Sequence, residues 1–183
     1  MKKYELLVDD TITFLGVQLF RIKALISFSG IEKGEVGGYI ASEKNLSQSG
    51  DAWVCGNAEV YGDARVCGDA RVYGNARVYG DAEVCGNARV YGNARVYGDT
   101  RVCGNAEVCG NADYIVFKNT WSSGRYFTYT KSNRKWRVGC FYGSGAELVE
   151  KAYKDSKKSG DFYKAYVDFV EKLEAIEDIH KEQ

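Results

Sequence analysis

The chain lacks several features that common protein functions require. Its 183 residues include no proline and one histidine, His180, close to the C-terminal end. A histidine general base must lie within hydrogen-bond reach of its substrate, so chemistry in the body of the chain would have to proceed without an imidazole. No apolar run approaches the ~18 residues of a membrane-spanning helix. The opening MKKYELLVDD is too acidic for a signal peptide, and we expect a cytoplasmic protein.

The chain also lacks net charge. Lysine and arginine total 25, aspartate and glutamate total 25, and the formal net charge is +0. This balance excludes a globally polycationic nucleic-acid binder, although local charged patches remain compatible with it. With 45% hydrophobic and 27% charged residues, the composition is typical of a globular protein of one or two domains.

Glycine, in contrast, is abundant and periodic. Eleven of the 21 glycines recur every six residues from Gly50 to Gly110, within the motif G-[DN]-A-x-V-[YC]. Alanine and valine, two positions apart, point to the same side of a strand, and Gly-Asp or Gly-Asn favours a sharp turn. Three hexapeptides per coil predict a parallel β-helix with 18 residues per coil, a valine and alanine interior, and rungs ~4.8 Å apart. The same phase extends back through Leu46 and Ile40.

The repeat resembles the hexapeptide-repeat family of left-handed β-helices, and the left hand is implied by that resemblance. The segments Gly37–Ile40 and Val138–Gly143 resemble the flanks of a group of hexapeptide-repeat proteins found in bacteriophages and prophages. Better-known relatives of the repeat are trimeric acyltransferases, which use a histidine base near a loop that projects from a coil. The repeat over 50–112 contains no histidine and no insertion, so the sequence favours a protein that is not an enzyme.

We expect three segments and a mainly β fold: an N-terminal β cap over 1–36, the β-helix over 37–112, and a C-terminal β-β-β-α-α domain over 113–183. In the last domain, Ser144 and Glu147 form a predicted capping box, and the first helix is expected to end at Gly160. The second helix runs from about Asp161 to His180 and carries one apolar stripe. The expected strands are Tyr114–Lys118, Arg125–Lys131 and Lys135–Tyr142, and the stripe consists of Phe162, Tyr166, Phe169, Leu173 and Ile176.

Read at a period of eighteen, the outward-facing residues of the predicted β-helix separate onto three faces. Tyrosine and cysteine are segregated by face rather than mixed. One face carries Tyr61, Tyr79 and Tyr97 beside Glu59, Arg77 and Arg95; the second carries Cys67, Cys85 and Cys103 beside Arg65, Glu83 and Arg101; the third carries Trp53, Arg71, Arg89 and Glu107 beside Cys55, Tyr73, Tyr91 and Cys109.

The tyrosine columns have two interpretations. Stacked tyrosines can simply support one another as cross-strand neighbours. Alternatively, flat faces rich in tyrosine, arginine and tryptophan have the composition of protein interfaces. On the second interpretation the candidate binding residues are Tyr61, Tyr79, Tyr97, Arg77, Arg95, Trp53, Arg71, Tyr73, Arg89 and Tyr91.

The cysteine and aspartate columns are also open to two interpretations each. Thiols one coil apart could form a disulfide or hold a soft metal, but the chain has no CxxC motif, and we expect reduced cysteines and no metal or cofactor. Asp63, Asp81 and Asp99 could hold a cation between coils or could serve only as turn formers.

A basic, aromatic segment over 118–137 contains no acidic residue. Such a pattern suits a phosphate backbone and unstacked bases, although a solvated hairpin or a protein contact would give the same pattern. The candidate anion or nucleic-acid contacts are Arg125, Lys131, Arg134, Lys135, Trp136 and Arg137.

Taken together, the sequence favours a non-enzymatic binding protein of phage or prophage origin. We expect it to block a host protein, with a CRISPR-type antiviral defence protein as the leading example, and to form a homo-oligomer such as a dimer or trimer. Two alternatives remain: a binder of a small anionic ligand or nucleotide, and a degenerate hexapeptide acyltransferase.

Overall fold

The computed structural model describes residues 2–181, which form two compact units. Unit 1 comprises Met1–Ile115 with Thr130–Asn133, and unit 2 comprises Val116–Tyr129 with Arg134–Gln183. Neither helix within the described residues has both the length and the apolar character needed to cross a membrane.

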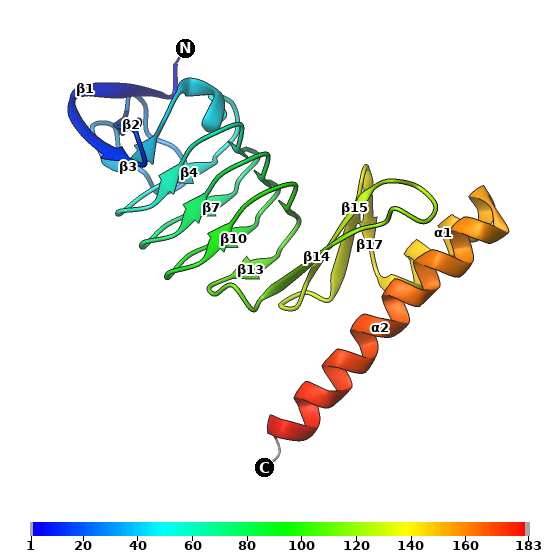
Figure 1. Cartoon of the computed structure of the whole chain (residues 1–183). Helices are drawn as coiled ribbons and strands as arrows, with labels where there is room; N and C mark the ends of the chain where they lie inside the picture. The colour runs from blue at the N-terminus through cyan, green and yellow to red at the C-terminus, as the bar shows by residue number, and fades with distance from the viewer. Residues whose placement is uncertain (1, 182–183) are drawn as a thin grey trace. The chain divides into compact units, whose positions relative to one another are not determined.

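Unit 1 is a β-solenoid of about four coils, and Figure 1 shows one column of its rungs. Parallel partners lie eighteen residues apart, as in Arg71 with Arg89 and Arg77 with Arg95, so the predicted register is confirmed. The short strands are β4 (Trp53–Val54), β5 (Glu59–Val60), β6 (Arg65–Val66), β7 (Arg71–Val72), β8 (Arg77–Val78), β9 (Glu83–Val84), β10 (Arg89–Val90), β11 (Arg95–Val96), β12 (Arg101–Val102) and β13 (Glu107–Val108).

The solenoid interior is filled by the valine and alanine of each hexapeptide. Val60, Val78 and Val96 are fully buried in one column, and Ala58 and Ala76 are buried beside them. Burying a valine side chain contributes about 1.5–3 kcal/mol, and every coil repeats the contribution. The alternation of inward-facing and outward-facing residues predicted from the A-x-V motif therefore determines which side chains point away from the solenoid interior.

Glycine at the corners meets two requirements at once. From Gly50 to Gly104 the corner glycines have φ between +63° and +73°, a region that side chains with a Cβ rarely adopt. A Cβ on Gly68 would also lie 2.9 Å from the backbone nitrogen of Gly86. The corners stack glycine on glycine, which explains why the residue recurs every six positions.

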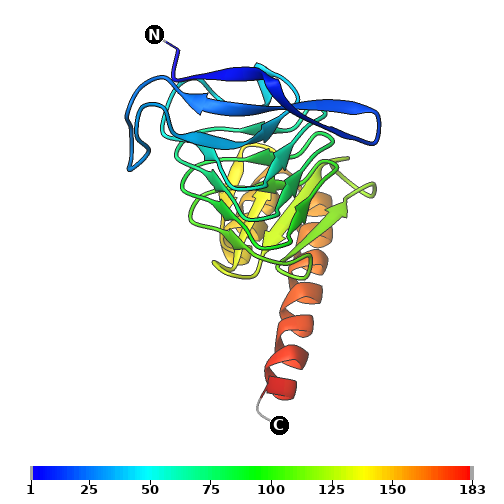
Figure 2. The ribbon, with the colours of Figure 1, turned by 90° about the vertical axis from the view of Figure 1, so that its left-hand side faces the viewer.

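The N-terminal strands extend one side of the solenoid. Strands β1 (Tyr4–Phe14) and β2 (Val17–Ala24) form an antiparallel hairpin next to β3 (Val36–Ile40), and Figure 2 shows this hairpin across one end of the coils. The sheet order is β1-β2-β3-β5-β8-β11. Ile40 pairs with Val60 and Leu46 with Val66, a separation of twenty residues. The first coil therefore contains twenty residues, two more than the eighteen that the sequence predicted when the repeat was extended back through Leu46 and Ile40.

Polar side chains cover the open edge of the first coil. Lys3 Nζ donates to the carbonyls of Ala52 (2.8 Å) and Gly50 (3.1 Å), and the Tyr4 hydroxyl donates to that of Leu46 (2.7 Å). Asn45, in the 3₁₀ helix η1 (Glu43–Asn45), donates to the Ala64 carbonyl at 2.8 Å. Buried backbone carbonyls need such partners, so the solenoid ends without unpaired edge groups at these positions.

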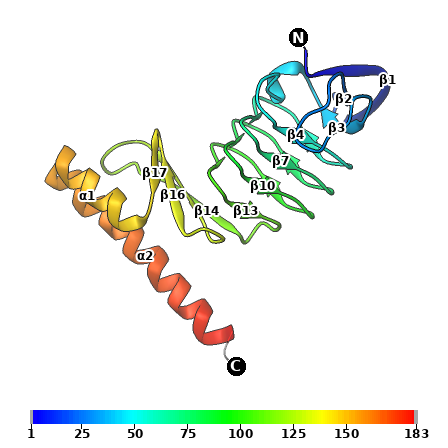
Figure 3. The ribbon, with the colours of Figure 1, turned by 180° about the vertical axis from the view of Figure 1, so that it is seen from behind.

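The C-terminal sheet has one more strand than predicted. Its order is β14-β15-β16-β17, and Figure 3 shows it with the two helices that follow. The segment predicted as one strand, Lys135–Tyr142, is a hairpin, because the chain turns at Gly139, whose φ is +57°. The strands are β14 (Tyr114–Lys118), β15 (Tyr126–Thr130), β16 (Lys135–Val138) and β17 (Phe141–Gly143).

The helices are α1 (Gly145–Asp155) and α2 (Lys157–Lys181). The capping box is confirmed, because Glu147 N donates to the Ser144 hydroxyl and Ser144 N donates to the Glu147 carboxylate at 2.7 Å. The expected helix end at Gly160 is wrong: the break lies at Ser156, and Gly160 is inside α2. A Cβ there would collide with the Tyr153 ring of α1, so glycine permits close packing of the two helices.

Candidate functional site

The most regular exposed feature of unit 1 is a column of tyrosines beside β5, β8 and β11. The rings of Tyr61 and Tyr79 stack at 5.1 Å with an angle of 3°, and those of Tyr79 and Tyr97 stack at 5.4 Å with an angle of 13°. Phe14 of β1 extends the column, 5.8 Å from Tyr61. We call the surface of Tyr61, Tyr79, Tyr97, Glu59, Arg77 and Arg95 the tyrosine face.

The stacking follows directly from the coil. Equivalent residues lie one rung apart, and the Tyr61 and Tyr79 backbone amides donate to Val78 and Val96 carbonyls at 3.0 Å. The backbone therefore sets the spacing of the rings. Burial, and next the neighbouring Tyr79, raise the pKa of Tyr61, whereas Tyr97 at the other end is 51% exposed. The column is therefore partly covered at Tyr61, next to Phe14, and open to solvent at Tyr97.

The two arginines of the tyrosine face differ in their surroundings. Arg77 forms an ion pair with Glu59 at 3.1 Å and lies 4.3 Å from the centre of the Phe14 ring. Arg95 is exposed, and its guanidinium makes no ion pair within the part of the chain that the structure describes. The positive charge that remains available on this face is thus that of Arg95.

On the third face, the prediction that Trp53 is an exposed interface residue is wrong. Trp53 is fully buried, because the cap covers it: the rings of Phe28 and Tyr4 lie 5.5 Å and 6.3 Å from it. Arg71 donates to the Ser29 carbonyl at 2.7 Å. The end of this face next to the cap is therefore covered, whereas the coils beyond it, as far as the exposed Glu107 and Cys109, remain open to solvent.

The open part of the third face holds a second, shorter tyrosine stack. The rings of Tyr73 and Tyr91 lie 5.0 Å apart with an angle of 5°. Arg89 forms an ion pair with Glu107 at 3.5 Å. This stack has the same chemistry as the tyrosine face, but its arginine is paired with an acid.

The cysteine column contains a disulfide. Cys85 and Cys103 are bonded across adjacent rungs, with a Cα–Cα distance of 4.7 Å, so the expectation of reduced thiols is wrong for this pair. Cys67 lies one rung away as a free thiol whose pKa is raised, first by burial and then by Glu83. Among the described residues, no group of three histidine, cysteine or acidic side chains is arranged to hold a metal ion.

The aspartate column carries mixed charge. Lys44 bonds Asp63 at 2.7 Å and lowers the pKa of its carboxyl. A hollow of about 410 Å³ over this column is lined by acids and by arginines on the same coils: Asp63, Asp81 and Glu83 with Arg65 and Arg101. The acids are thus accompanied by basic side chains of this chain.

The basic segment is not a single surface. The prediction that Trp136 contacts an anion is wrong, because this side chain is 2% exposed and packs 5.1 Å from the Tyr129 ring. Arg134 lies 3.8 Å from Glu174, and Arg137 donates to the Cys140 carbonyl at 3.2 Å. The other predicted anion contacts do not belong to one unit, because Lys131 lies in unit 1 whereas Arg125 and Lys135 lie in unit 2.

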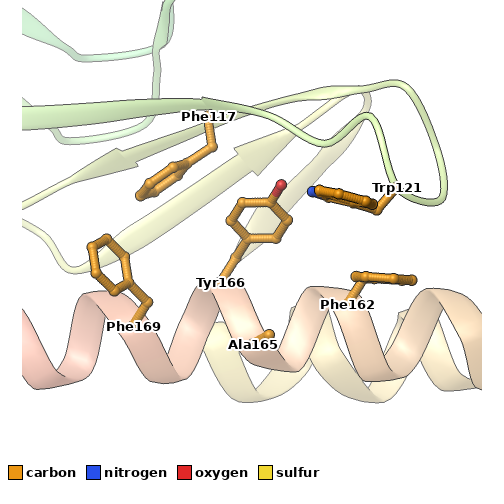
Figure 4. Close-up of a pocket in the computed structure, with 6 residues that line it drawn as sticks. All are labelled: Phe117, Trp121, Phe162, Ala165, Tyr166 and Phe169. Carbon is orange, nitrogen blue, oxygen red and sulfur yellow. The ribbon is translucent and has the colours of Figure 1, made fainter.

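Unit 2 contains an apolar pocket that the sequence analysis missed. It has a volume of about 330 Å³ and lies between β14 with its following loop and α2 (Figure 4). Trp121 stacks on Phe162 at 6.1 Å, and Phe117 meets the ring of Phe169 at 6.0 Å. The signal in the sequence was the apolar stripe of the second helix. The pocket is lined by Phe117, Trp121, Phe162, Ala165, Tyr166 and Phe169.

The comparisons with known proteins add one finding to this geometry. A family model described as "YdcK Beta solenoid repeat" matches residues 70–86, 82–98 and 88–104. These matches cover the central coils, so this part of the chain is similar to that solenoid repeat. No curated protein matches the chain.

Proposed function

We propose that this protein is a non-enzymatic binding protein whose tyrosine face docks a partner protein. The observation that carries the proposal is the parallel stack of Tyr61, Tyr79 and Tyr97, which ends in the exposed Tyr97 ring. Beside this ring lies the exposed Arg95, whose guanidinium makes no ion pair with the residues that the structure describes. Tyrosine and arginine dominate the binding energy of many protein interfaces.

Rigidity strengthens this interpretation. Binding normally costs about 0.5–1.5 kcal/mol for each flexible side chain that becomes ordered. The stacked rings are already held at 5.1 Å and 5.4 Å by the coil and by one another, so little of that cost remains. The exposed Arg95 favours a partner that presents a carboxylate at the same place, because a bidentate pair with arginine adds specificity.

The proposed origin is a phage or prophage, and the proposed target is a bacterial host protein, with a CRISPR-type defence protein as the leading example. The support is the resemblance of the flanking segments Gly37–Ile40 and Val138–Gly143 to phage hexapeptide-repeat proteins. The absence of histidine from 50–112 supports the non-enzymatic part of the proposal over a degenerate acyltransferase.

A small anionic ligand is supported less well. Arg77 and Arg89 form ion pairs with Glu59 and Glu107, and Arg71 donates to a backbone carbonyl. An anion would have to displace these partners. Mass spectrometry of the denatured protein would detect a nucleotide that is retained through purification, and such a nucleotide would replace the present proposal.

The test compares two matched surface variants by capture from a bacterial host lysate. The first variant is Arg95→Glu with Tyr97→Ala on the tyrosine face, and the control is Tyr73→Ala with Tyr91→Ala on the other stack. A partner of the tyrosine face should bind the wild type and the control, and should bind the first variant at least about 30-fold more weakly, the loss typical of an interface hot spot. Captured proteins that bind both variants equally would overturn the proposal.

A further inference from the structure

The cysteine column (Cys67, Cys85 and Cys103) places three cysteine side chains on consecutive rungs of one sheet. Each cysteine directly follows one strand of the sheet whose order is β12-β9-β6. Cys85 and Cys103 form the disulfide, with their Cα atoms 4.7 Å apart, whereas Cys67 is a free thiol. Because a disulfide joins two sulfurs and the column holds three, one thiol remains next to the bonded pair.

The two intervals of the column are equivalent. The Cys67 N–H donates to the Val84 carbonyl at 3.0 Å. The Cys85 N–H donates in the same way to the Val102 carbonyl at 2.9 Å, and β6 pairs with β9 in the same parallel register as β9 with β12. The backbone therefore holds Cys67 and Cys85 one rung apart, the spacing at which Cys85 already bonds Cys103. One rung, ~4.8 Å, lies within the ~4.4–6.8 Å between Cα atoms that a disulfide accepts.

The order of the column suits thiol–disulfide exchange. In that reaction a thiolate attacks one sulfur of a disulfide from the side opposite the sulfur that leaves. Because β9 lies between β6 and β12, Cys67 is on the side of Cys85 opposite Cys103. Cys67 and Cys103 are two rungs apart, about 9.6 Å, which is too far for a disulfide between them. The sulfur that Cys67 can attack is therefore that of Cys85.

We infer that the cysteine column is an intramolecular thiol–disulfide exchange site, in which the disulfide of Cys85 moves between Cys103 and Cys67. The Cys67 thiol gives its proton to solvent, and its thiolate sulfur forms a bond with Cys85 Sγ. The bond between Cys85 and Cys103 breaks at the same time, and its electron pair leaves on Cys103 Sγ, which takes up a proton from solvent. One disulfide is present before and after the step, so no oxidant or reductant is consumed.

The column ends at Cys67. On the preceding rung the equivalent position is Ser47, whose N–H donates to the Val66 carbonyl at 2.9 Å, and a serine hydroxyl cannot form a disulfide. Cys55 and Cys109 follow β4 and β13, which belong to a different sheet. The exchange therefore has two end states, with the free thiol at one end of the column or at the other.

The two end states present the free thiol differently. Cys67 is half-buried, whereas Cys103 is 5% exposed, so the exchange withdraws the free thiol from external disulfides and alkylating reagents. Burial, and next Glu83, raise the pKa of the Cys67 thiol, so the thiolate is a minor form near neutral pH and we expect exchange over minutes to hours. The site lies on a different sheet from the tyrosine face, and the inference therefore goes beyond the proposed function.

The first experiment maps the disulfides of the full chain, purified without reductant and incubated overnight. Acid stops the exchange by protonating the thiolates, and digestion with pepsin at low pH followed by mass spectrometry then identifies the cross-linked peptides. Cross-links of Cys85 to Cys103 and of Cys85 to Cys67 should both be found, within about tenfold of each other, because each closes a loop of the same length. A wild type that contains only one of these cross-links, or three free thiols in the column, overturns the inference.

The second experiment removes one thiol at a time. Cys103→Ala should shift the whole disulfide to Cys67 and Cys85. Cys85→Ala should leave Cys67 and Cys103 as free thiols, because they are two rungs apart. The control Cys140→Ala, at an exposed position of unit 2, should show both cross-links of the wild type, and circular dichroism should show the sheet signal in every variant.

Two outcomes of the second experiment would contradict the inference. A folded Cys103→Ala protein that lacks the bond between Cys67 and Cys85 would show that Cys67 does not reach the sulfur it must attack. A disulfide between Cys67 and Cys103 in Cys85→Ala would contradict the rung spacing on which the exchange depends.

Discussion

The two units of this protein are stabilised in different ways. In the solenoid of unit 1, Val60, Val78 and Val96 have equivalent surroundings, and each contact recurs one coil later. In unit 2 the main contacts are individual: Trp136 packs on Phe127 and Tyr129 of the neighbouring strand, and the Tyr129 hydroxyl donates to the Glu174 carboxylate across 45 residues. A repeat spreads its stability over many small, equal terms, whereas a small mixed sheet concentrates it in a few large side chains.

The largest effect should come from a charge in the solenoid interior. Val90 of β10 is fully buried, so Val90→Asp places an unpaired carboxylate among valines and alanines at a cost of about 3–5 kcal/mol or more. The strands β7 and β13 pair with β10 on either side, so the damage should spread to adjacent coils. Urea denaturation should show the loss of the β-sheet signal at lower urea concentration.

In the same experiment, the helical signal in circular dichroism tests whether unit 2 stays folded when unit 1 is destabilised. Both α-helices among the described residues lie in unit 2, so circular dichroism at the helical band reports that unit. The helical signal should persist in Val90→Asp. The control is Arg89→Asp, at an exposed position of the same strand, which should change the free energy of unfolding by less than about 1 kcal/mol. Simultaneous loss of both signals would show that unit 2 cannot fold without the solenoid.

A somewhat smaller effect is expected from removing the central tryptophan of unit 2. Trp136 is 2% exposed, and replacing a buried tryptophan by alanine costs about 3–5 kcal/mol. Trp136→Ala should abolish the cooperative thermal transition of the helical signal and leave the sheet signal of unit 1 intact. Trp121→Ala, at a position 65% exposed, is the matched control and should cost less than about 1 kcal/mol. Equal effects of the two substitutions would contradict a core centred on Trp136.

The same difference explains which parts of the fold could be predicted. The coil register and the three faces followed from the sequence because a period of eighteen places like residues over like residues, as in Tyr61, Tyr79 and Tyr97. The prediction of exposed faces fails where a segment of the chain outside the repeat packs against the coils. Trp53 stands in an outward position, but the cap covers it through Phe28, and no feature within the hexapeptides records the presence of a cap.

The C-terminal site was harder to predict for a similar reason. A strand that alternates basic and aromatic residues does not reveal which of its faces the helices will cover, so Trp136 could be core or contact. In α2 two apolar stripes run side by side, and the structure buries Tyr163, Val167 and Val170. The stripe through Phe169 and Leu173 was visible in the sequence, but its exposure depends on how the helix rotates against the sheet.

The smallest predicted effect concerns Lys3, the buried cation at the end of the solenoid. Lys3 is 2% exposed, and burial lowers its pKa from 10.5 to about 8. Between pH 8 and about pH 10 Lys3 is therefore protonated in the unfolded chain and largely neutral in the folded chain, so the contribution of Lys3 to the free energy of unfolding of unit 1 should rise with pH by about 2 kcal/mol. Burial raises the pKa of the Cys55 and Cys67 thiols, and their contribution falls over the same interval because only the unfolded thiols lose their protons. Above pH 10 tyrosine acts in the same direction as the thiols, because burial raises the pKa of Tyr114 to about 12.

This pH dependence separates the units, because no lysine of unit 2 is comparably buried among the described residues. In urea titrations followed by the sheet signal, the difference in the free energy of unfolding between the wild type and Lys3→Met should rise between pH 8 and 10, whereas the helical signal of unit 2 should give no such difference. The control Lys33→Met, at an exposed position, should follow the pH dependence of the wild type. A difference between the wild type and Lys3→Met that does not change with pH would show that the carbonyls of Gly50 and Ala52 are not held by a cation with a lowered pKa.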